Sequence, residues 1–199
     1  MIQFQSLRKA YGEQILFSNL NLTLDRGFLV FGGPSGCGKT TLCRIAAGLE
    51  KPDHGKVSGI TGRPAILFQE PRLLPSLSAV DNVACVSKKK NGRNAASALL
   101  MLLGFSVTDL SKKPPALSGG MQQRVALARL ILFASENEGN LVVLDEPFRG
   151  LDPETKKKAA ELLAGLADRA VLLITHDAAD AALFGVPYHD FDDIKAGAC

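Results

Sequence analysis

The stretch that decides the fold reads Gly33-Pro34-Ser35-Gly36-Cys37-Gly38-Lys39-Thr40-Thr41. A short apolar run, residues 28–31, precedes it, and a helical pattern of apolar residues follows it. Glycines at this spacing let the backbone curl until successive N–H groups point inward, where they can bind phosphate oxygens. The helix that follows adds its own free N–H groups and the positive end of its dipole. The sequence therefore predicts a phosphate-binding loop between a buried strand and a helix.

Each position of this loop is a candidate contact to a nucleotide. Lys39 is expected to reach the β- and γ-phosphates, and the Thr40 hydroxyl to ligate Mg²⁺, a hard cation that prefers oxygen. Thr41 is expected to add a further phosphate contact. The predicted nucleotide-binding residues of the loop are Gly33, Pro34, Ser35, Gly36, Cys37, Gly38, Lys39, Thr40 and Thr41.

The composition is that of one compact domain, with room for a subdomain. The chain has 199 residues, 46% of them hydrophobic, which suffices for a core of that size. Its apolar runs are far shorter than the roughly 20 residues that cross a bilayer, and its first residues lack the pattern of a secretory signal. The four cysteines follow no zinc or disulfide spacing, so reduced thiols in the cytosol are expected.

The charge indicates no nucleic-acid partner. A net charge of +3 is too small to argue for one. The basic run at residues 88–93 has no interleaved aromatic side chain that could stack on bases. A solvated loop is therefore favoured there over a patch for nucleic acid or anionic lipid.

The first residues predict antiparallel strands. Residues 2–8 and 20–24 alternate apolar and polar side chains, with a turn at 11–13 between them. The position of Tyr11 fits an ordinary surface residue as well as a platform on which an adenine ring stacks. A weak edge strand is expected at 57–60.

The helix after the phosphate loop is expected to bury Leu42, Ile45 and Leu49 on one face. A short buried strand is then predicted at 65–68. In open α/β sheets ligands lie beyond the carboxyl ends of the strands. Gln69, which follows this strand, is therefore expected to face the phosphates.

A largely helical segment is predicted at residues 75–134, inserted into a sheet domain made of residues 1–74 and 135–199. Three amphipathic patterns support it, at 80–86, 95–103 and 121–133. Leu99, Leu102 and Leu103 are expected to pack in its core.

Ser118, Gly119 and Gly120 stand at the start of the last of these helices. The serine is in N-cap position, so an ordinary helix cap is one interpretation. Two adjacent glycines are costly at a helix start unless something approaches the backbone closely. A second helix end that faces phosphate is the preferred interpretation.

Polar side chains follow two further buried strands, predicted at 141–144 and 170–174. Asp145 and Glu146 are adjacent carboxylates, which are hard to explain structurally after an apolar strand. Beside Mg²⁺ and a nucleotide, Asp145 would enter the magnesium shell and Glu146 would orient or deprotonate the attacking water. His176 ends the next strand on the same edge, and a role in sensing the γ-phosphate is favoured over a structural one.

Asp152 is the predicted N-cap of a helix that places Ala159, Leu162, Leu163 and Leu166 on one face. Residues 156–158, all lysines, are expected to form a solvated face. The acidic segment 185–199 shows no motif.

The combination and order of these motifs, over roughly residues 2–184, resemble the ATP-binding subunits of ABC transporters. Residues 33–41 resemble the Walker A loop, and residues 117–121 resemble the family's signature sequence, which other P-loop proteins lack. Residues 141–145 are similar to Walker B, with Glu146 as the catalytic carboxylate. The remaining matches are Tyr11 with the adenine-stacking aromatic, Gln69 with the Q-loop glutamine, residues 150–152 with the D-loop and His176 with the switch histidine.

The resemblance implies an α/β P-loop NTPase with a RecA-like, mostly parallel sheet, an antiparallel β subdomain and an inserted helical subdomain. It implies ATP and Mg²⁺ as cofactors, and hydrolysis of ATP to ADP and phosphate. The implied catalytic residues are Glu146, His176 and Gln69, and the implied magnesium ligands are Thr40, Gln69 and Asp145. Further nucleotide contacts implied are Tyr11, Asp152, Ser118, Gly119 and Gly120.

The resemblance also implies partners. Two copies would sandwich two ATP molecules, with Ser118 and Gly120 acting on the ATP held by the other copy. The dimer would drive a membrane permease for import from the cytoplasmic face of the membrane, with a solute-binding protein as an indirect partner. Residues 68–75 and 80–83 are most similar to importers of the nitrate, sulfonate and taurine group, whereas Ser76 departs from that group's pattern.

Two alternatives remain at the level of sequence. The first is a P-loop small-molecule kinase, which would need an acceptor pocket and an arginine-bearing lid. The second is a soluble ABC-type ATPase that acts on DNA or the ribosome and is not tied to transport. Such proteins usually carry long insertions or paired cassettes, and this chain has one cassette.

Overall fold

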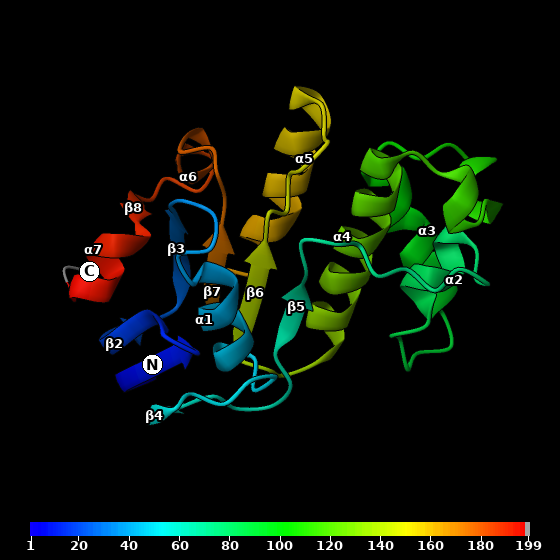
Figure 1. Ribbon diagram of the computed structural model, residues 1–199. Helices are drawn as coiled ribbons and strands as arrows, with labels where there is room; N and C mark the ends of the chain where they lie inside the picture. Colours follow the sequence, from blue (N-terminus) through cyan, green and yellow to red (C-terminus); the bar gives the residue numbers. More distant parts are fainter. Residues whose placement is uncertain (198–199) are drawn as a thin grey trace.

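The computed structural model describes residues 1–197 and contains two sheets. The larger is parallel, and its strands pair in the order β5-β6-β7-β3-β8 (Figure 1). Its strands are β3 (Gly27–Gly32), β5 (Ala65–Leu67), β6 (Leu141–Asp145), β7 (Ala170–Ile174) and β8 (Tyr188–Asp190). Every residue of β6 and β7 is buried, which is why both are almost entirely apolar. The expected α/β fold with a mostly parallel sheet is confirmed.

The smaller sheet is antiparallel, in the order β2-β1-β4. Its strands are β1 (Ile2–Tyr11), β2 (Gln14–Leu24) and β4 (His54–Ser58). Phe4 and Leu22 are paired across β1 and β2, and both are buried. Gly12, with φ of 58°, lies in the turn, in a conformation that glycine adopts readily. The turn is therefore tighter than expected, and Tyr11 is the last residue of β1.

Two hydrophobic cores lie on opposite faces of the parallel sheet. Along β6, Leu141 and Val143 pack into one core, whereas Val142 and Leu144 pack into the other. The first core joins the sheet to β1, β2 and α1 (Lys39–Ala46). The second joins it to α4 (Gly119–Glu136) and α5 (Pro153–Ala164).

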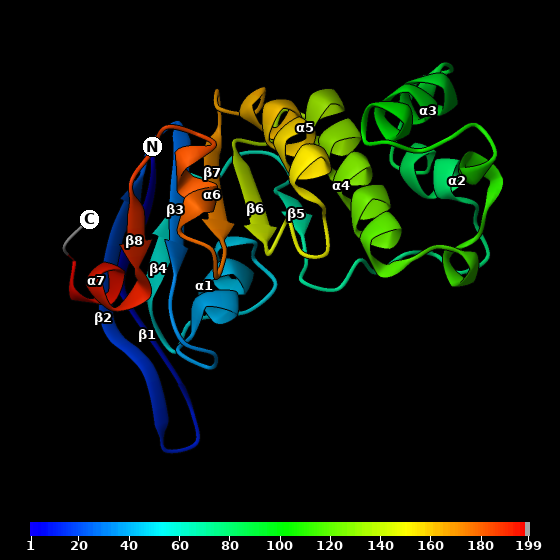
Figure 2. The same cartoon turned by 90° about the horizontal axis from the view of Figure 1, so that it is seen from above.

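A helical region lies at the opposite end of the molecule from the antiparallel sheet (Figure 2). It contains α2 (Ala79–Ala84), α3 (Gly92–Leu102), the short 3-10 turns η1 (Asp109–Ser111) and η2 (Pro114–Ala116), and α4. The inward face of α3 carries Ala96 and Leu100, and Leu103 is buried just beyond the helix. The expectation for Leu102 was wrong, because this side chain is 56% exposed. The division of the chain into a core and an inserted helical subdomain stays a prediction.

The C-terminal segment differs most from the expectation. After α6 (Ala179–Ala182), strand β8 pairs with β3, and α7 (Phe191–Ala196) follows directly. Phe191 is fully buried, and its ring centroid lies 5.6 Å from that of Phe31. A strand of three residues is too short to show a pattern in sequence, which is why this segment was missed. Residues 198–199 of the segment lie outside the described residues.

The helix after the phosphate loop is shorter than expected. Helix α1 ends at Ala46, and Gly48, with φ of 71°, turns the chain away. Leu42 and Ile45 are buried as expected, whereas Leu49 is exposed. Across residues 1–197, every helix is too short or too polar to cross a bilayer.

Candidate nucleotide site

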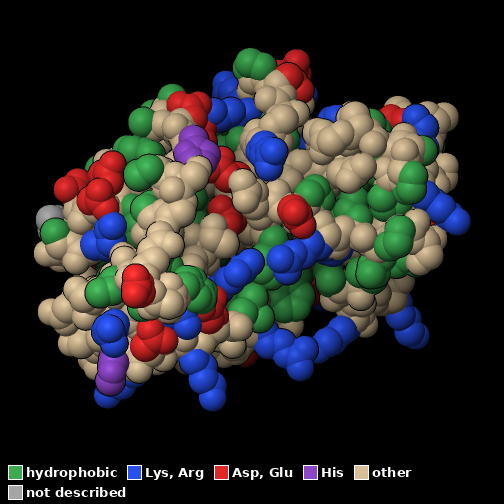
Figure 3. Space-filling view, viewed as in Figure 1, with side chains coloured by type: hydrophobic (Ala, Val, Ile, Leu, Met, Phe, Trp, Pro, Cys, Tyr) green, Lys and Arg blue, Asp and Glu red, His purple; other side chains and the backbone are tan. Residues whose placement is uncertain are grey.

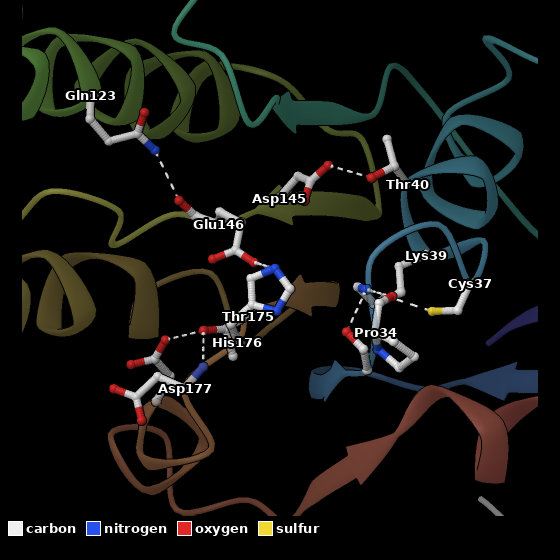
Figure 4. A network of polar contacts seen from close by, with 12 residues as sticks. Pro34, Cys37, Lys39, Thr40, Gln123, Asp145, Glu146, Thr175, His176 and Asp177 are labelled. Carbon is white, nitrogen blue, oxygen red and sulfur yellow. Dashed lines mark hydrogen bonds and ion pairs between the residues drawn. The ribbon is translucent and has the colours of Figure 1, made fainter.

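The phosphate loop joins β3 to α1 and takes a backbone path that glycine allows. Gly33, Gly36 and Gly38 have φ values of 142°, 80° and 111°, a region that other residues rarely adopt. Gly38 is also the N-cap of α1. Lys39 lies across the loop, and its Nζ donates to the carbonyl oxygens of Gly33 and Pro34, each at 2.8 Å (Figure 4). The loop therefore places a positive charge and the free N–H groups of a helix start at one point.

A hydroxyl and a carboxylate meet beside this loop. Thr40 Oγ1 donates a hydrogen bond of 3.1 Å to Asp145 Oδ2, which joins α1 to the end of β6 (Figure 4). Asp145 is 7% exposed, and this burial raises the pKa of its carboxyl, an effect that the Thr40 hydrogen bond opposes. Two hard oxygen donors fit Mg²⁺. No group of three or more His, Cys, Asp or Glu that could hold a metal occurs in residues 1–197, so phosphate and water would have to supply the other ligands.

Glu146 and His176 face each other at the same edge of the sheet. His176 Nε2 lies 3.1 Å from Glu146 Oε1 (Figure 4). The backbone N–H of Glu146 donates to the carbonyl of Ile174, at 3.0 Å, which extends the pairing of β6 with β7. Burial raises the pKa of Glu146, and the nearby His176 opposes this shift. A carboxylate beside an imidazole is an arrangement suited to orienting or deprotonating a water molecule.

Gln123 is a residue that the sequence did not single out. It is buried on α4, and its side-chain amide donates to the carbonyl oxygens of Glu146, at 3.1 Å, and Pro147, at 3.4 Å. Glu146 has φ of 53°, which is uncommon for a residue with a side chain. Gln123 therefore holds a strained backbone at the site. Its polarity alone did not distinguish it in the sequence, because its neighbours Gln122 and Arg124 are polar as well.

Tyr11 lies beside the phosphate loop. The residue is 49% exposed, and its hydroxyl hydrogen-bonds to Glu50. A cavity of about 280 Å³ is lined by Tyr11, Gln14, Leu16, Gly36, Gly38, Lys39, Thr40 and Thr41. An exposed aromatic ring next to a phosphate loop is placed to stack on a base.

Gln69 is not brought into contact with the other candidates. Strand β5 ends at Leu67, and Gln69 lies two residues further on with an exposed side chain. Within residues 1–197 no hydrogen bond joins it to Thr40 or Asp145. It nevertheless follows a strand parallel and adjacent to β6, so it lies at the same edge of the sheet.

The two glycines at the start of α4 have different surroundings. Ser118 caps the helix by accepting a hydrogen bond of 3.2 Å from the N–H of Met121. A Cβ on Gly120 would overlap the carbonyl oxygen of Gly150, whereas a Cβ on Gly119 would meet nothing within 4 Å. Close packing inside the chain thus accounts for Gly120. Gly119 faces open space.

This helix start is separated from the phosphate loop of its own chain. In both ribbon views β5 and β6 lie between α1 and α4 (Figures 1 and 2). Asp152, the other candidate on this side, caps α5 by accepting from the N–H and the hydroxyl of Thr155, at 3.0 Å and 2.7 Å. These hydrogen bonds lower the pKa of Asp152.

Fold and site together define a P-loop ATPase. Residues 17–149 match the family model described as ABC transporter. The chain is 42% identical over 181 residues to the aliphatic sulfonates import ATP-binding protein SsuB 2 of Pseudomonas syringae pv. tomato, a match that covers 89% of this chain and 75% of the relative. It is 40% identical over 185 residues to SsuB 1 of Nocardia farcinica, with 90% and 73% covered.

Solved structures give the same result. A dimeric ATP-binding cassette in a post-hydrolysis state, bound to ADP and Pi, has a TM-score of 0.81 and 27% identity, with 94% of both chains covered. A dimeric bacterial ABC transporter cassette has a TM-score of 0.80 and 28% identity, with 96% of this chain and 94% of that chain covered. The chain belongs to the ABC transporter family, as an ATP-binding subunit that hydrolyses ATP. Within the family it is most similar to importers of the sulfonate, nitrate and taurine group, as its sequence indicated.

Proposed function

We propose that this subunit forms an ATP-sandwich homodimer and drives a permease that imports aliphatic sulfonates or closely related organic anions. The observation that carries the hydrolytic part is the pair of contacts beside the phosphate loop, Thr40 with Asp145 and Glu146 with His176. The names of the two relatives support the cargo, since both are described as aliphatic sulfonates import proteins.

The separation of the signature segment from the phosphate loop supports the dimer. Residues 117–121 and the loop lie on opposite sides of β5 and β6 (Figure 2). A second copy would bring Ser118 and the open backbone of Gly119 to the phosphates of the first. Both solved structures cited above are dimeric.

In the proposed mechanism Lys39 and the loop N–H groups bind the β- and γ-phosphates, and Tyr11 stacks on the adenine. Thr40 and Asp145 would hold Mg²⁺, with Gln69 as a further oxygen ligand. When bound, the metal would neutralise charge on the phosphate oxygens.

The two residues at the ends of β6 and β7 activate and position the water that attacks the γ-phosphate. Glu146 orients or deprotonates the water, and its raised pKa makes it a better proton acceptor. His176, at 3.1 Å, fixes that carboxylate and faces the γ-phosphate. At the edges of the site, Gln69 acts as a further catalytic residue and Asp152 as a further nucleotide contact.

A permease would dock on the helical end of the molecule. On the face in Figure 3 hydrophobic side chains gather around β5, α2 and α4, and an apolar hollow of about 230 Å³ is lined by Pro64, Ile66, Val86, Ala126, Arg129, Leu130 and Phe133. Arg129 donates to the carbonyl oxygens of Pro71 and Arg72, at 2.8 Å and 3.1 Å, which ties this hollow to the segment after Gln69. Docking there would hold the subunit on the cytoplasmic face of the membrane, with a solute-binding protein acting on the other side.

Glu146→Gln tests the hydrolytic part of the proposal. Loss of such a group typically costs on the order of a thousandfold in phosphoryl-transfer rate. The variant should bind ATP, run as a dimer in size-exclusion chromatography with ATP, and release almost no phosphate. ATPase activity like that of the wild type would overturn the assignment. The wild type should release phosphate from ATP without any acceptor molecule, whereas a small-molecule kinase would need one. This assay therefore distinguishes an ATPase from a kinase.

Co-purification tests the transport part. A tagged wild-type subunit should retain an integral membrane protein from a detergent extract. Transport of radiolabelled alkane sulfonate into proteoliposomes with that partner should require ATP. Retention of nucleic acid or ribosomes in place of a membrane protein would favour the soluble ABC ATPase.

A further inference from the structure

A buried carboxylate on α6 joins the end of β7 to α5, and the proposed mechanism does not use it. Asp180 is 2% exposed. One of its oxygens accepts a hydrogen bond from the hydroxyl of Thr175, and the other pairs with Nζ of Lys156 on α5. A buried charge is costly without partners of this kind. The three side chains therefore form a closed polar unit at the end of β7.

This unit fixes the backbone on both sides of His176. Thr175 precedes it, and the N–H of Thr175 donates to the carbonyl of Phe31 at 3.1 Å. Asp177 follows it, and the N–H of Asp177 donates to Thr175 Oγ1 at 3.1 Å (Figure 4). The imidazole itself is 57% exposed and pairs with Glu146. Its position therefore depends on the backbone that carries it.

Lys156 connects this backbone to α5. Its Nζ lies 2.8 Å from Asp177 Oδ2, in addition to its pairing with Asp180, and 5.8 Å from the ring centroid of Phe148. Partial burial disfavours its charged form, but the hydrogen bonds to the two carboxylates raise the pKa of Lys156. The expectation of a solvated face was wrong for this lysine, because its partners follow the next strand.

We propose that Lys156 and Asp180 are positioning residues for ATP hydrolysis, which hold residues 175–177 so that His176 Nε2 stays within hydrogen-bond distance of Glu146. The inference rests on the proposed roles of Glu146 and His176. A displacement of about 1 Å in a reacting group can cost about 100-fold in rate. Within residues 1–197 no hydrogen bond or ion pair joins either residue to the phosphate loop, so kcat should fall while ATP affinity does not change.

Three variants test this, with Lys157→Met as the matched control because Lys157 is exposed on the same helix. Asp180→Asn removes the charge with little change in volume. Lys156→Met keeps the Thr175 hydrogen bond to Asp180 but leaves a buried carboxylate without its cation. Asp180→Asn leaves no buried charge unpaired, because Lys156 keeps Asp177 as a partner, so it is the variant that folds if Lys156→Met does not. Both should lower kcat about 10- to 100-fold with unchanged affinity for a fluorescent ATP analogue. Lys156→Arg should restore most of the rate, and Lys157→Met should behave as the wild type.

The link to His176 is tested by combining variants. If Asp180 acts through His176, Asp180→Asn should lower the rate no further in a His176→Ala background. If the rate losses of Asp180→Asn and His176→Ala multiply in the double variant, the inference is wrong. Wild-type kcat in both Asp180→Asn and Lys156→Met would overturn it as well. So would a parallel loss of ATP affinity and thermal stability, which indicates a general structural role. Wild-type kcat in His176→Ala would instead overturn the proposed function, so the two failures are distinguishable.

Discussion

Replacing Phe191 with alanine tests whether α7 supports the phosphate loop. The side chain is fully buried and stacks on Phe31, and a Cβ on Gly33 or Gly38 would lie only 3.3 Å or 3.4 Å from its atoms. Truncation of a buried phenylalanine costs about 3–5 kcal/mol in free energy of unfolding. For a chain of this length that corresponds to a fall in Tm of roughly 10 °C. We also expect weaker ATP binding, because the loop loses the surface on which it packs.

Urea unfolding followed by circular dichroism measures the first effect, and titration with a fluorescent ATP analogue measures the second. Leu102→Ala is the control, since that side chain is 56% exposed and its removal should change the free energy of unfolding by about 0.5 kcal/mol or less. A loss of less than about 1 kcal/mol in Phe191→Ala would refute the packing argument. Wild-type ATP affinity in a clearly destabilised variant would refute the link to the loop.

Three further predictions follow from single contacts. Gly120→Ala should lower ATPase activity and Tm, because its Cβ would overlap the Gly150 carbonyl; activity and Tm equal to wild type would contradict this. Hydrogen bonds from Lys112 and Ser106 lower the pKa of Asp109 from 3.8 to about 2. Its stabilising contribution is therefore present above about pH 4 and lost toward pH 2, so Asp109→Asn should lower Tm at neutral pH and no longer do so near pH 2; a deficit that does not vary with pH would argue against this. Burial raises the pKa of the Cys43 thiol, so a thiol reagent followed by mass spectrometry should label exposed Cys85 far sooner, and equal rates would disprove it.

Most of the sheet could be predicted because its central strands are buried on both faces. Residues 141–144 and 170–174 are short continuous apolar runs, as is typical of parallel strands buried on both faces. The edge strand β8 has three residues and, within residues 1–197, pairs with β3 alone, so its sequence carries no such signal. It leads directly into α7, where the burial of Phe191 is a property of the assembled fold.

The candidate site could be predicted where ionisable side chains directly follow the end of a buried strand. Asp145, Glu146 and His176 come directly after apolar runs, and parallel strands bring such ends together. The contacts of Lys156 and Gln123 could not be predicted, because their partners lie far away in the sequence. The roles of all these residues stay predictions until the variants above are measured.

The approach of Gly120 to the carbonyl of Gly150 has a mechanical consequence. Two backbones in direct contact have no side chain between them that could change rotamer, so displacement of one must move the other. A displacement of the start of α4 toward Gly150 would therefore press on the segment that leads into α5. Lys156 on α5 passes the same displacement to the loop that holds His176. A push on the helical end of the molecule would in this way reach the hydrolytic edge of the sheet through a short chain of stiff contacts.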